Sequence, residues 1–431
     1  MIQRSPVLQR PVRDVALAFV FGLGLLYVAL SAWLAFTLRP SPHSDWALYW
    51  SSAGNLPAYE RGGVGWWLLS VPKSLGLEPA MAALLLNLGA GVAVLYLAWR
   101  TDRGRYRLRA LLTGAYLCLL APFAGIVQLD LAAACFVAFA FAFATWAVSR
   151  PAVRSLWWLA GACLAAGVST KPQYALLAWT MALLLAAPAW YWRRQSPWAA
   201  SFVLMLVAGS LLGFGFDQAH RLSGERSEAL RTSSAVTLYA GLLVSRASQE
   251  PGARPCGYWT PEAADAARED LGKSLPVAIA DRLAERPVSH WFAVMKCKLP
   301  EVLGPPPFAL RWMLMSPAVE SRVSTAGSHW QDRVQKILKH ERLLYSVTCL
   351  LVLAGLAMAS RQAWRRGQRF GALLPLAWVA AFWSVHLVFE IQGRYFLGLF
   401  LLAPLAAALA LRQQGGGVGR IGDLPTKSGV P

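Results

Sequence analysis

The isolated polar and charged side chains that could do chemistry fall in four short motifs, each at the border of a long apolar segment. Fixed cations stabilise the charge that develops on a departing phosphate, and a carboxylate can accept the proton of an attacking hydroxyl. The motifs contain cations, carboxylates and aromatic rings, so they suit the transfer of a sugar from a lipid-phosphate donor. They are His43-Ser44-Asp45-Trp46-Ala47-Leu48-Tyr49-Trp50, Gln128-Leu129-Asp130, Ser169-Thr170-Lys171-Pro172-Gln173-Tyr174 and Glu390-Ile391-Gln392-Gly393-Arg394-Tyr395.

Each motif also has an explanation without chemistry. Asp45 could only cap a helix beside the membrane, and Asp130 could interact with a helix dipole. Lys171 and Arg394 could extend to lipid head groups. Glu390 lies four residues before Arg394, a spacing typical of an ion pair within one helix. The hypothesis of one shared site therefore requires all four motifs to lie at the same face of the membrane.

The composition is that of a membrane protein. Of the 431 residues, 56% are hydrophobic and only 15% are charged, and the mean hydropathy is +0.43. We expect an all-α polytopic membrane protein with about ten transmembrane helices, juxtamembrane helices and one large outside loop. Segment 155–168 is short and precedes Lys171-Pro172, so it could be a broken or re-entrant helix. The ten segments, none with Asp, Glu, Lys or Arg, are 15–38, 80–99, 110–127, 131–148, 155–168, 174–192, 197–216, 343–360, 370–389 and 395–411.

The distribution of Lys and Arg predicts the orientation, because cytoplasmic connections are enriched in both. With a cytoplasmic N-terminus, the short inside segments hold 19 Lys or Arg and the short outside segments five. The net charge of +19 is then a topology signal, and not a sign of nucleic-acid binding. The predicted parts are a cytoplasmic N-terminus (1–14), helices one to seven (15–216) with a first outside loop (39–79), a large outside loop (217–342), helices eight to ten (343–411) and a disordered cytoplasmic tail (412–431).

The outside loops carry further signals. The glycine-rich run from Gly62 to Leu69 contains Trp66 and Trp67 and predicts a helix along the membrane interface. Helical runs are expected at 261–286 and 288–303, separated by Pro287. Cys256 and Cys297 share the large loop and could form a disulfide in an oxidising compartment, or remain two free thiols. The sequence has no Walker, G-x-G-x-x-G, C-x-x-C or H-E-x-x-H motif.

The order of these elements resembles the bacterial GT-C superfamily of glycosyltransferases, which use polyprenyl-phosphate sugars and include relatives of protein O-mannosyltransferases and the lipid A aminoarabinose transferase. Family members often have two adjacent acidic residues in the first loop, whereas Trp46 follows Asp45 here, so the subfamily and any divalent metal requirement stay open. The resemblance lies in Asp45 to Trp50, Lys171-Pro172, Glu390 to Tyr395 followed by Pro404, Gly241, Cys256-Gly257-Tyr258-Trp259, and a helix from His290-Trp291-Phe292 to Lys296 and Lys298.

The residues and the resemblance together predict an inverting glycosyltransferase in a bacterial cytoplasmic membrane, with its site facing the periplasm or outside. Its partners would be a polyprenyl-phosphate-linked sugar, a glycan, lipid or protein acceptor and membrane lipids, with no nucleic acid and no required cofactor. The roles expected are Asp45 as base, Lys171 and Arg394 as donor-phosphate ligands, Glu390, Asp130 and Gln173 as supporting residues, and Tyr49, Trp66, Trp67 and Tyr395 as the substrate groove.

Three other functions are compatible with the sequence. An O-antigen-type polymerase or ligase would use a lipid-linked oligosaccharide as donor. A transporter or flippase would be expected to carry charges at mid-membrane depth and inverted repeats, and a non-catalytic scaffold would tolerate the loss of Asp45.

Overall fold

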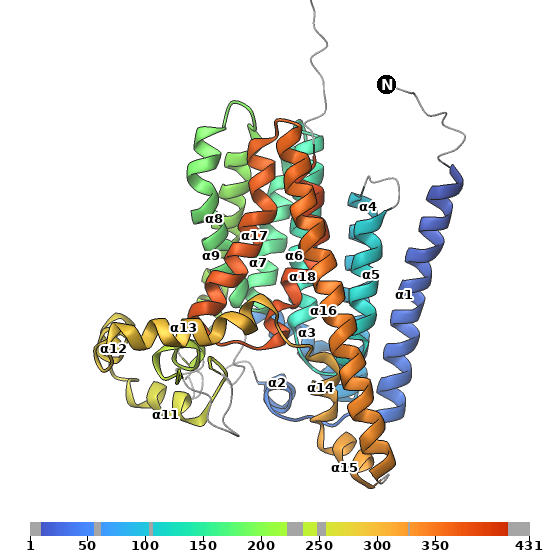
Figure 1. Cartoon of the computed structure of the whole chain (residues 1–431), viewed down its shortest axis with the longest axis vertical. Coiled ribbons are helices and arrows are strands. Elements are labelled where there is room, and N and C mark those ends of the chain that lie inside the picture. The colour runs from blue at the N-terminus through green and yellow to red at the C-terminus, as the bar shows by residue number, and fades with distance from the viewer. Residues whose placement is uncertain are drawn as a thin grey trace, which may run out of the picture.

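A computed structural model describes residues 10–55, 62–102, 107–221, 236–247, 256–325 and 328–412. Within these ranges every regular element is helical (Figure 1). The predicted disordered tail lies outside the described residues from 413 onward, as do the first nine residues of the predicted cytoplasmic N-terminus.

Long helices run side by side and form a bundle (Figure 1). Eight of the described helices are long and apolar enough to cross a membrane, and the apolar helices Leu108–Phe123 and Ser155–Thr170 are shorter. The chain is therefore a polytopic helical membrane protein. The bundle helices are α1 (Arg10–Leu38), α4 (Pro79–Thr101), α5 (Leu108–Leu120), α6 (Asp130–Ser149), α7 (Ser155–Thr170), α8 (Gln173–Tyr191), α9 (Trp198–Arg221), α16 (Ser328–Arg365), α17 (Arg369–Val388) and α18 (Leu397–Ala410).

Three predicted segments differ from the observed helices. α16 begins at Ser328, well before the predicted start at 343, so its first part extends beyond the apolar region. α5 ends at Leu120 and only a 3-10 helix, η3 (Ala121–Phe123), follows, because the buried Asn87 side chain donates to the carbonyls of Ala124 and Ile126 and stabilises a turn there. α7 is one continuous helix that ends at Thr170.

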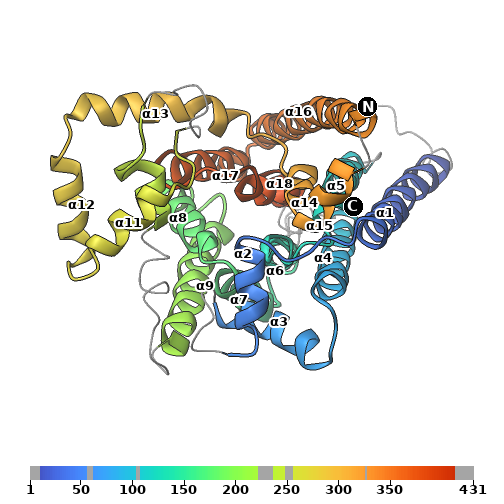
Figure 2. The same cartoon turned by 90° about the horizontal axis from the view of Figure 1, so that it is seen from below.

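Short helices gather at one end of the bundle, which we name the loop end (Figures 1 and 2). Seen from this end, α14 and α15 lie across the bundle, while α11 and α12 extend to one side (Figure 2). The predicted run 261–286 is two helices, because Pro276 occupies the first turn of a new helix after a break. These helices are α2 (Asp45–Ser52), α3 (Gly63–Ser74), η4 (Tyr239–Leu243), α11 (Pro261–Glu269), α12 (Leu275–Ala284), α13 (Val288–Leu303), α14 (Ala309–Leu314) and α15 (Pro317–Thr325).

α18 is the central helix of the bundle. All its residues from Leu397 to Ala410 are buried, and it packs against α4, α5, α6, α16 and α17. It contains only apolar residues, many of them Ala, and small side chains let neighbouring helices approach closely in a membrane. The 3-10 helix η5 (Gly393–Phe396) leads directly into α18, so the residues of η5 are fixed to the most buried part of the fold.

Candidate functional site

The first feature of the site is an ion pair between Asp45 and Arg394. Asp45 is the first residue of α2, and Arg394 lies in η5. Nη2 of Arg394 donates a hydrogen bond of 2.7 Å to Oδ2 of Asp45. The Arg394 side chain is only 2% exposed, whereas the Asp45 side chain is 32% exposed. We name this the open pair, because its carboxylate reaches the surface.

Aromatic rings enclose the guanidinium of Arg394. Its Cζ lies 4.5 Å from the ring centroid of Trp312 in α14 and 5.2 Å from that of Tyr395. Two further nitrogens of this guanidinium, Nε and Nη1, are buried and donate no hydrogen bond within the described residues. Buried donors in proteins normally have an acceptor. Within the described residues, the guanidinium of Arg394 therefore keeps donors that the fold itself does not use.

A second ion pair joins Asp130 and Lys171, whose Nζ donates to Oδ1 of Asp130. Asp130 opens α6 and Lys171 follows the last residue of α7, so each charge also complements the dipole of the helix beside it. Both side chains are nearly inaccessible, at 2% and 8% exposure. We name this the sealed pair.

The two ion pairs are neighbours. Nζ of Lys171 lies 5.2 Å from the centroid of the Tyr395 ring, the same ring that Arg394 contacts. The guanidinium of Arg394 also interacts electrostatically with Asp130 as well as with Asp45. Residues from all four sequence motifs are thus brought together at the loop end.

Glu390 is buried and supports the segment before Arg394. Its carboxylate accepts hydrogen bonds from the Gln392 side chain and, over 3.3 Å, from the hydroxyl of Tyr395. α17 ends at Val388 and η5 begins at Gly393, so Glu390 and Arg394 do not lie on one helix, as the alternative explanation of their spacing required. The carboxylate that pairs with Arg394 is that of Asp45.

The other predicted site residues lie around this centre. Tyr49 of α2 is buried and interacts electrostatically with Arg394. Gln173 is half-buried as the first residue of α8, two residues after Lys171. Trp66 and Trp67 are on α3 with ring centroids 5.4 Å apart, and Trp67 is exposed.

The glycine-rich turn fixes α3 against the bundle. The backbone amide of Gly63 donates to Oδ1 of Asp217 in α9, and that of Val64 donates to Oγ of Ser169 in α7. A Cβ at Gly62 would collide with the backbone carbonyl of Ser169, so only glycine permits this approach. The helix expected along the interface is therefore joined to the residues next to Lys171.

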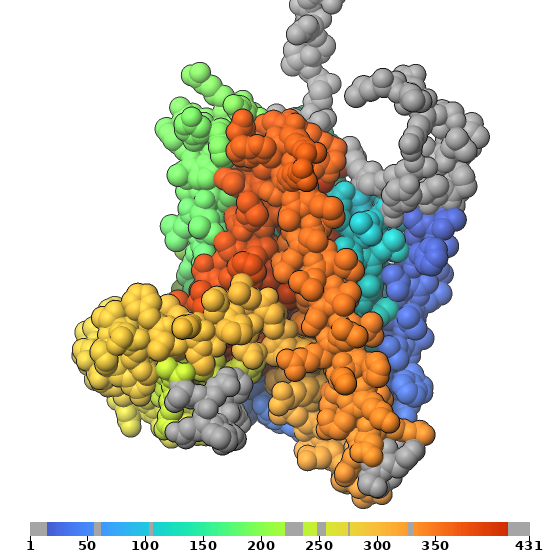
Figure 3. Space-filling model, in the orientation of Figure 1, coloured from blue at the N-terminus to red at the C-terminus, as the bar shows by residue number. Residues whose placement is uncertain are grey.

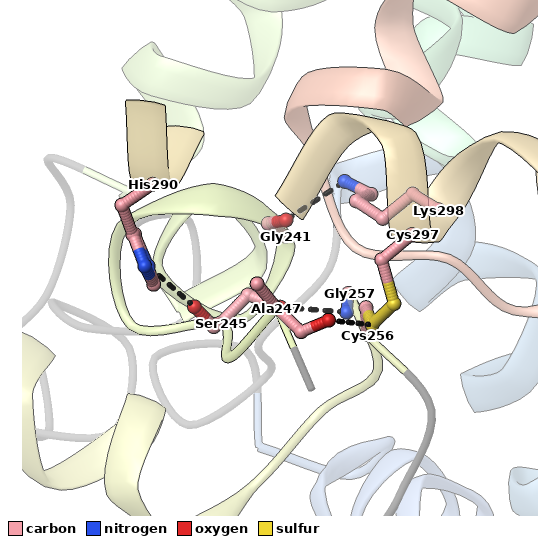
Figure 4. Close-up of a disulfide and its surroundings, with 8 residues drawn as sticks. All are labelled: Gly241, Ser245, Ala247, Cys256, Gly257, His290, Cys297 and Lys298. Carbon is pink, nitrogen blue, oxygen red and sulfur yellow. Dashed lines mark hydrogen bonds between the residues drawn. A yellow bond between two sulfur atoms is a disulfide. The ribbon is translucent and has the colours of Figure 1, made fainter. Parts of the chain in front are cut away.

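The large loop holds the segment that carries Arg394. Nζ of Lys298 donates to the carbonyl of Gly241 at 2.8 Å (Figure 4). It also donates to the carbonyls of Leu387 and Phe389, at 2.7 and 2.9 Å. Burial lowers the pKa of Lys298 to about 7, and attraction to Glu390 opposes that shift. Three acceptors match the three protons of an ammonium group. Lys298 thus ties η4 and α13 to the end of α17.

A disulfide joins Cys256 to Cys297, the residue before Lys298 (Figure 4). Next to it, the carbonyl of Gly257 accepts a 2.8 Å hydrogen bond from the amide of Ile391. The disulfide joins the turn at Cys256-Gly257 to α13, and both are bonded to the segment just before η5: Gly257 to Ile391, and Lys298 of α13 to Phe389.

Three residues of this site escaped sequence reasoning: Trp312, Asp217 and His386. Trp312 lies in a loop segment without a recognisable pattern, and Asp217 directly follows the predicted span 197–216 but was not counted among the motifs at span borders. His386, inside α17, stacks on Tyr395 with centroids 5.7 Å apart. A polar residue inside an apolar span is a usable signal for such a position.

Within the described ranges, no group of three or more His, Cys, Asp or Glu side chains is arranged to hold a metal ion. No protein-family model, curated protein or solved structure matches the chain, so an assignment of function depends on the site itself.

Proposed function

We propose that this protein is an inverting glycosyltransferase of the GT-C type, with ten transmembrane helices in a bacterial cytoplasmic membrane and its site on the periplasmic or outer side. It would move a sugar from a polyprenyl-phosphate donor to an acceptor of the cell envelope. The observation that carries the proposal is the open pair, because a buried Arg394 with unpaired donors lies beside an accessible carboxylate. This combination suits an anionic leaving group and an attacking hydroxyl.

Arg394 is the expected contact of the donor phosphate. A phosphate oxygen would compete with Asp45 for the guanidinium, and its binding would release the Asp45 carboxylate. Asp45 would then take the proton of the acceptor hydroxyl, whose oxygen attacks the anomeric carbon. The bond from this carbon to the phosphate oxygen breaks, and the polyprenyl phosphate leaves with the electron pair. No cofactor is needed for this displacement.

The other residues would position these groups. Lys171 would add positive charge at the phosphate from within the sealed pair, with Asp130 and Gln173 as its support. Glu390 would hold Tyr395 and the segment before Arg394. Tyr49, Trp66, Trp67 and Tyr395 would contact the sugar or the first isoprene units, since aromatic faces suit both.

The sealed and open pairs both lie where spans end, near the loop end, and not in the middle of a span. This supports an enzyme acting at the membrane surface over a transporter, whose charges are expected at mid-membrane depth. A polymerase or ligase that uses a lipid-linked oligosaccharide would need a similar surface site, so experiment must separate it from the proposed enzyme.

Mass analysis of carrier lipids and envelope glycans can make this separation. It would compare a strain lacking the protein with strains that regain either the native chain or its Asp45→Asn variant. We expect a polyprenyl-phosphate monosaccharide to accumulate, and one sugar to disappear from an envelope component, unless the native chain is restored. Accumulation of a lipid-linked oligosaccharide would instead assign the polymerase or ligase function, and unchanged profiles of both would contradict a transferase.

A further inference from the structure

α13 has three distinct sides. The side formed by Trp291, Val294, Lys298 and Val302 is buried in the protein. A second side faces the rest of the large loop, where Cys297 forms the disulfide and His290 lies 3.3 Å from the carbonyl of Ser245 (Figure 4). The third side is apolar and exposed.

The exposed side is a continuous stripe. Val288 and Phe292 are each 68% exposed, Leu299 is 42% exposed and Leu303 is 45% exposed. At 3.6 residues per turn, Val288 and Leu299 lie about 160 to 180° around the helix from Cys297. The stripe therefore points away from the disulfide and the loop segments that the disulfide holds.

The height of α13 along the bundle is fixed by its bonds to α17. Lys298 donates to the carbonyls of Leu387 and Phe389, at the last turn of that span, so α13 passes the point at which α17 leaves the apolar region. Figure 1 shows α13 running across the bundle axis, below the lower ends of α8 and α17 and above α11. In the space-filling view it projects sideways beyond the bundle (Figure 3).

The occupant of this stripe follows from its position. The side with Cys297 meets the rest of the large loop and the buried side with Lys298 meets the end of α17, so the stripe occupies the remaining direction, at the level where the outward faces of the spans begin. Those outward faces carry exposed apolar side chains, such as Leu376 of α17. An exposed apolar stripe at this level is placed to contact the same lipid that covers the outward faces of the spans. Lys296, exposed on the same helix, can reach lipid phosphates.

The geometry points to α13 as a membrane-interface helix, with the stripe Val288, Phe292, Leu299 and Leu303 immersed between lipid head groups and the first methylene groups. Because Lys298 joins this helix to the segment before Arg394, lipid contact would also set the depth of the open pair. The inference stands on its own and does not depend on the proposed transferase activity.

Nitroxide spin labels on single cysteines test the immersion in reconstituted protein. The free cysteines Cys118, Cys135, Cys163 and Cys349 are replaced by Ala, and the disulfide is kept. The test positions are Phe292→Cys, on the stripe, and Ala293→Cys, exposed on the adjacent side toward Cys297. Leu376→Cys gives the lipid reference, and the exposed Asp332→Cys on the protruding part of α16 gives the water reference.

We expect the label at position 292, like the one at 376, to be more accessible to oxygen than to a water-soluble nickel complex, with a smaller preference because position 376 lies deeper in the membrane. The label at 293 should match the one at 332, with the opposite preference. If the label at 292 behaves like the one at 332, the stripe is in water and the inference is wrong. Low accessibility to both reagents would also overturn it, because another protein or a second copy would then cover the stripe.

A second measurement avoids the alanine background. In membrane fragments whose two faces are both accessible, with the native cysteines retained, a water-soluble maleimide should modify Phe292→Cys far less than Ala293→Cys, and detergent should abolish the difference. Equal modification before detergent, or continued protection of position 292 after it, would contradict lipid contact.

Discussion

The open and sealed pairs contain the same chemical groups but differ in which group reaches the surface. In the sealed pair, Asp130 and Lys171 are both buried. In the open pair, Arg394 is buried and Asp45 is not. A buried pair cannot lose one partner without leaving an uncompensated charge, which is strongly unfavourable. The half-buried carboxylate of Asp45 can give up its partner when an anionic substrate takes its place at Arg394.

Lys171 and Arg394 have similar positions in the sequence but different surroundings in the structure. Lys171 and Arg394 both follow apolar segments at the same end of the bundle, and both were expected to bind phosphate. Their surroundings differ, so we propose that Arg394 exchanges its acceptor, whereas Lys171 stays paired with Asp130, holds two helix ends together and adds its charge from there.

The largest expected effect is the loss of transfer activity when the Asp45 carboxylate of the open pair is removed. Asp45→Asn keeps the shape of the side chain and removes its basicity, so transfer should fall by about 10²–10⁴-fold, the usual contribution of a general base. Transfer would be measured in membranes that contain equal amounts of protein, from the carrier-linked sugar that disappears. The exposed Asp332→Asn is the matched control and should leave the rate unchanged. A rate for Asp45→Asn within a few fold of the native value would remove the base from the account.

Substitutions in the sealed pair should lower the stability of the folded protein. Lys171→Met leaves Asp130 buried without its cation, which is expected to cost about 3–5 kcal/mol of folding free energy. The double variant Asp130→Leu with Lys171→Met removes both charges and should recover most of that loss. Unfolding of the purified protein in denaturing detergent gives the comparison. A double variant as unstable as the single one would show that the pair is not the source of the effect.

The smallest effect is expected when charge is kept and only geometry changes. Arg394→Lys retains a cation but loses the planar guanidinium and its contact with the Trp312 ring. Loss of one such contact should raise the transition-state barrier for transfer by about 2–4 kcal/mol. Lys171→Arg should leave transfer less affected than stability, since the sealed pair has little room for a larger group. If neither variant changed transfer or stability, neither cation would have the role proposed for it.

Much of the fold was predictable because apolar length and the positions of Lys and Arg are strong signals in a membrane protein. The helices end within a few residues of most predicted borders. Two exceptions are local. The Asn87 side chain stabilises the turn after η3, so α5 ends earlier than the apolar segment does. α7 is continuous to Thr170, although Lys171-Pro172 suggested a break. Neither exception can be read from hydropathy.

The sequence indicated which residues belong to the site, but not which carboxylate forms an ion pair with which cation. The motifs of Asp45, Lys171 and Arg394 were recognisable because isolated charges beside spans are costly. The partners depend on how α2, α6, α7 and η5 meet, which no short motif encodes. Spacing therefore suggested Glu390 as the neighbour of Arg394, whereas the fold provides Asp45 from more than 300 residues away.

The most direct test of the central claim is whether the site binds a lipid phosphate through Arg394. Equilibrium binding of a polyprenyl phosphate and of the matching polyprenol would be compared in nanodiscs, for the native chain, Arg394→Gln and the exposed control Lys339→Gln. We predict that the native and Lys339→Gln proteins bind the phosphate at least tenfold more tightly than the alcohol, a difference of about 1.4 kcal/mol, and that Arg394→Gln loses this preference. Equal affinity of the native chain for both lipids, or a preference that survives in Arg394→Gln, would contradict the account.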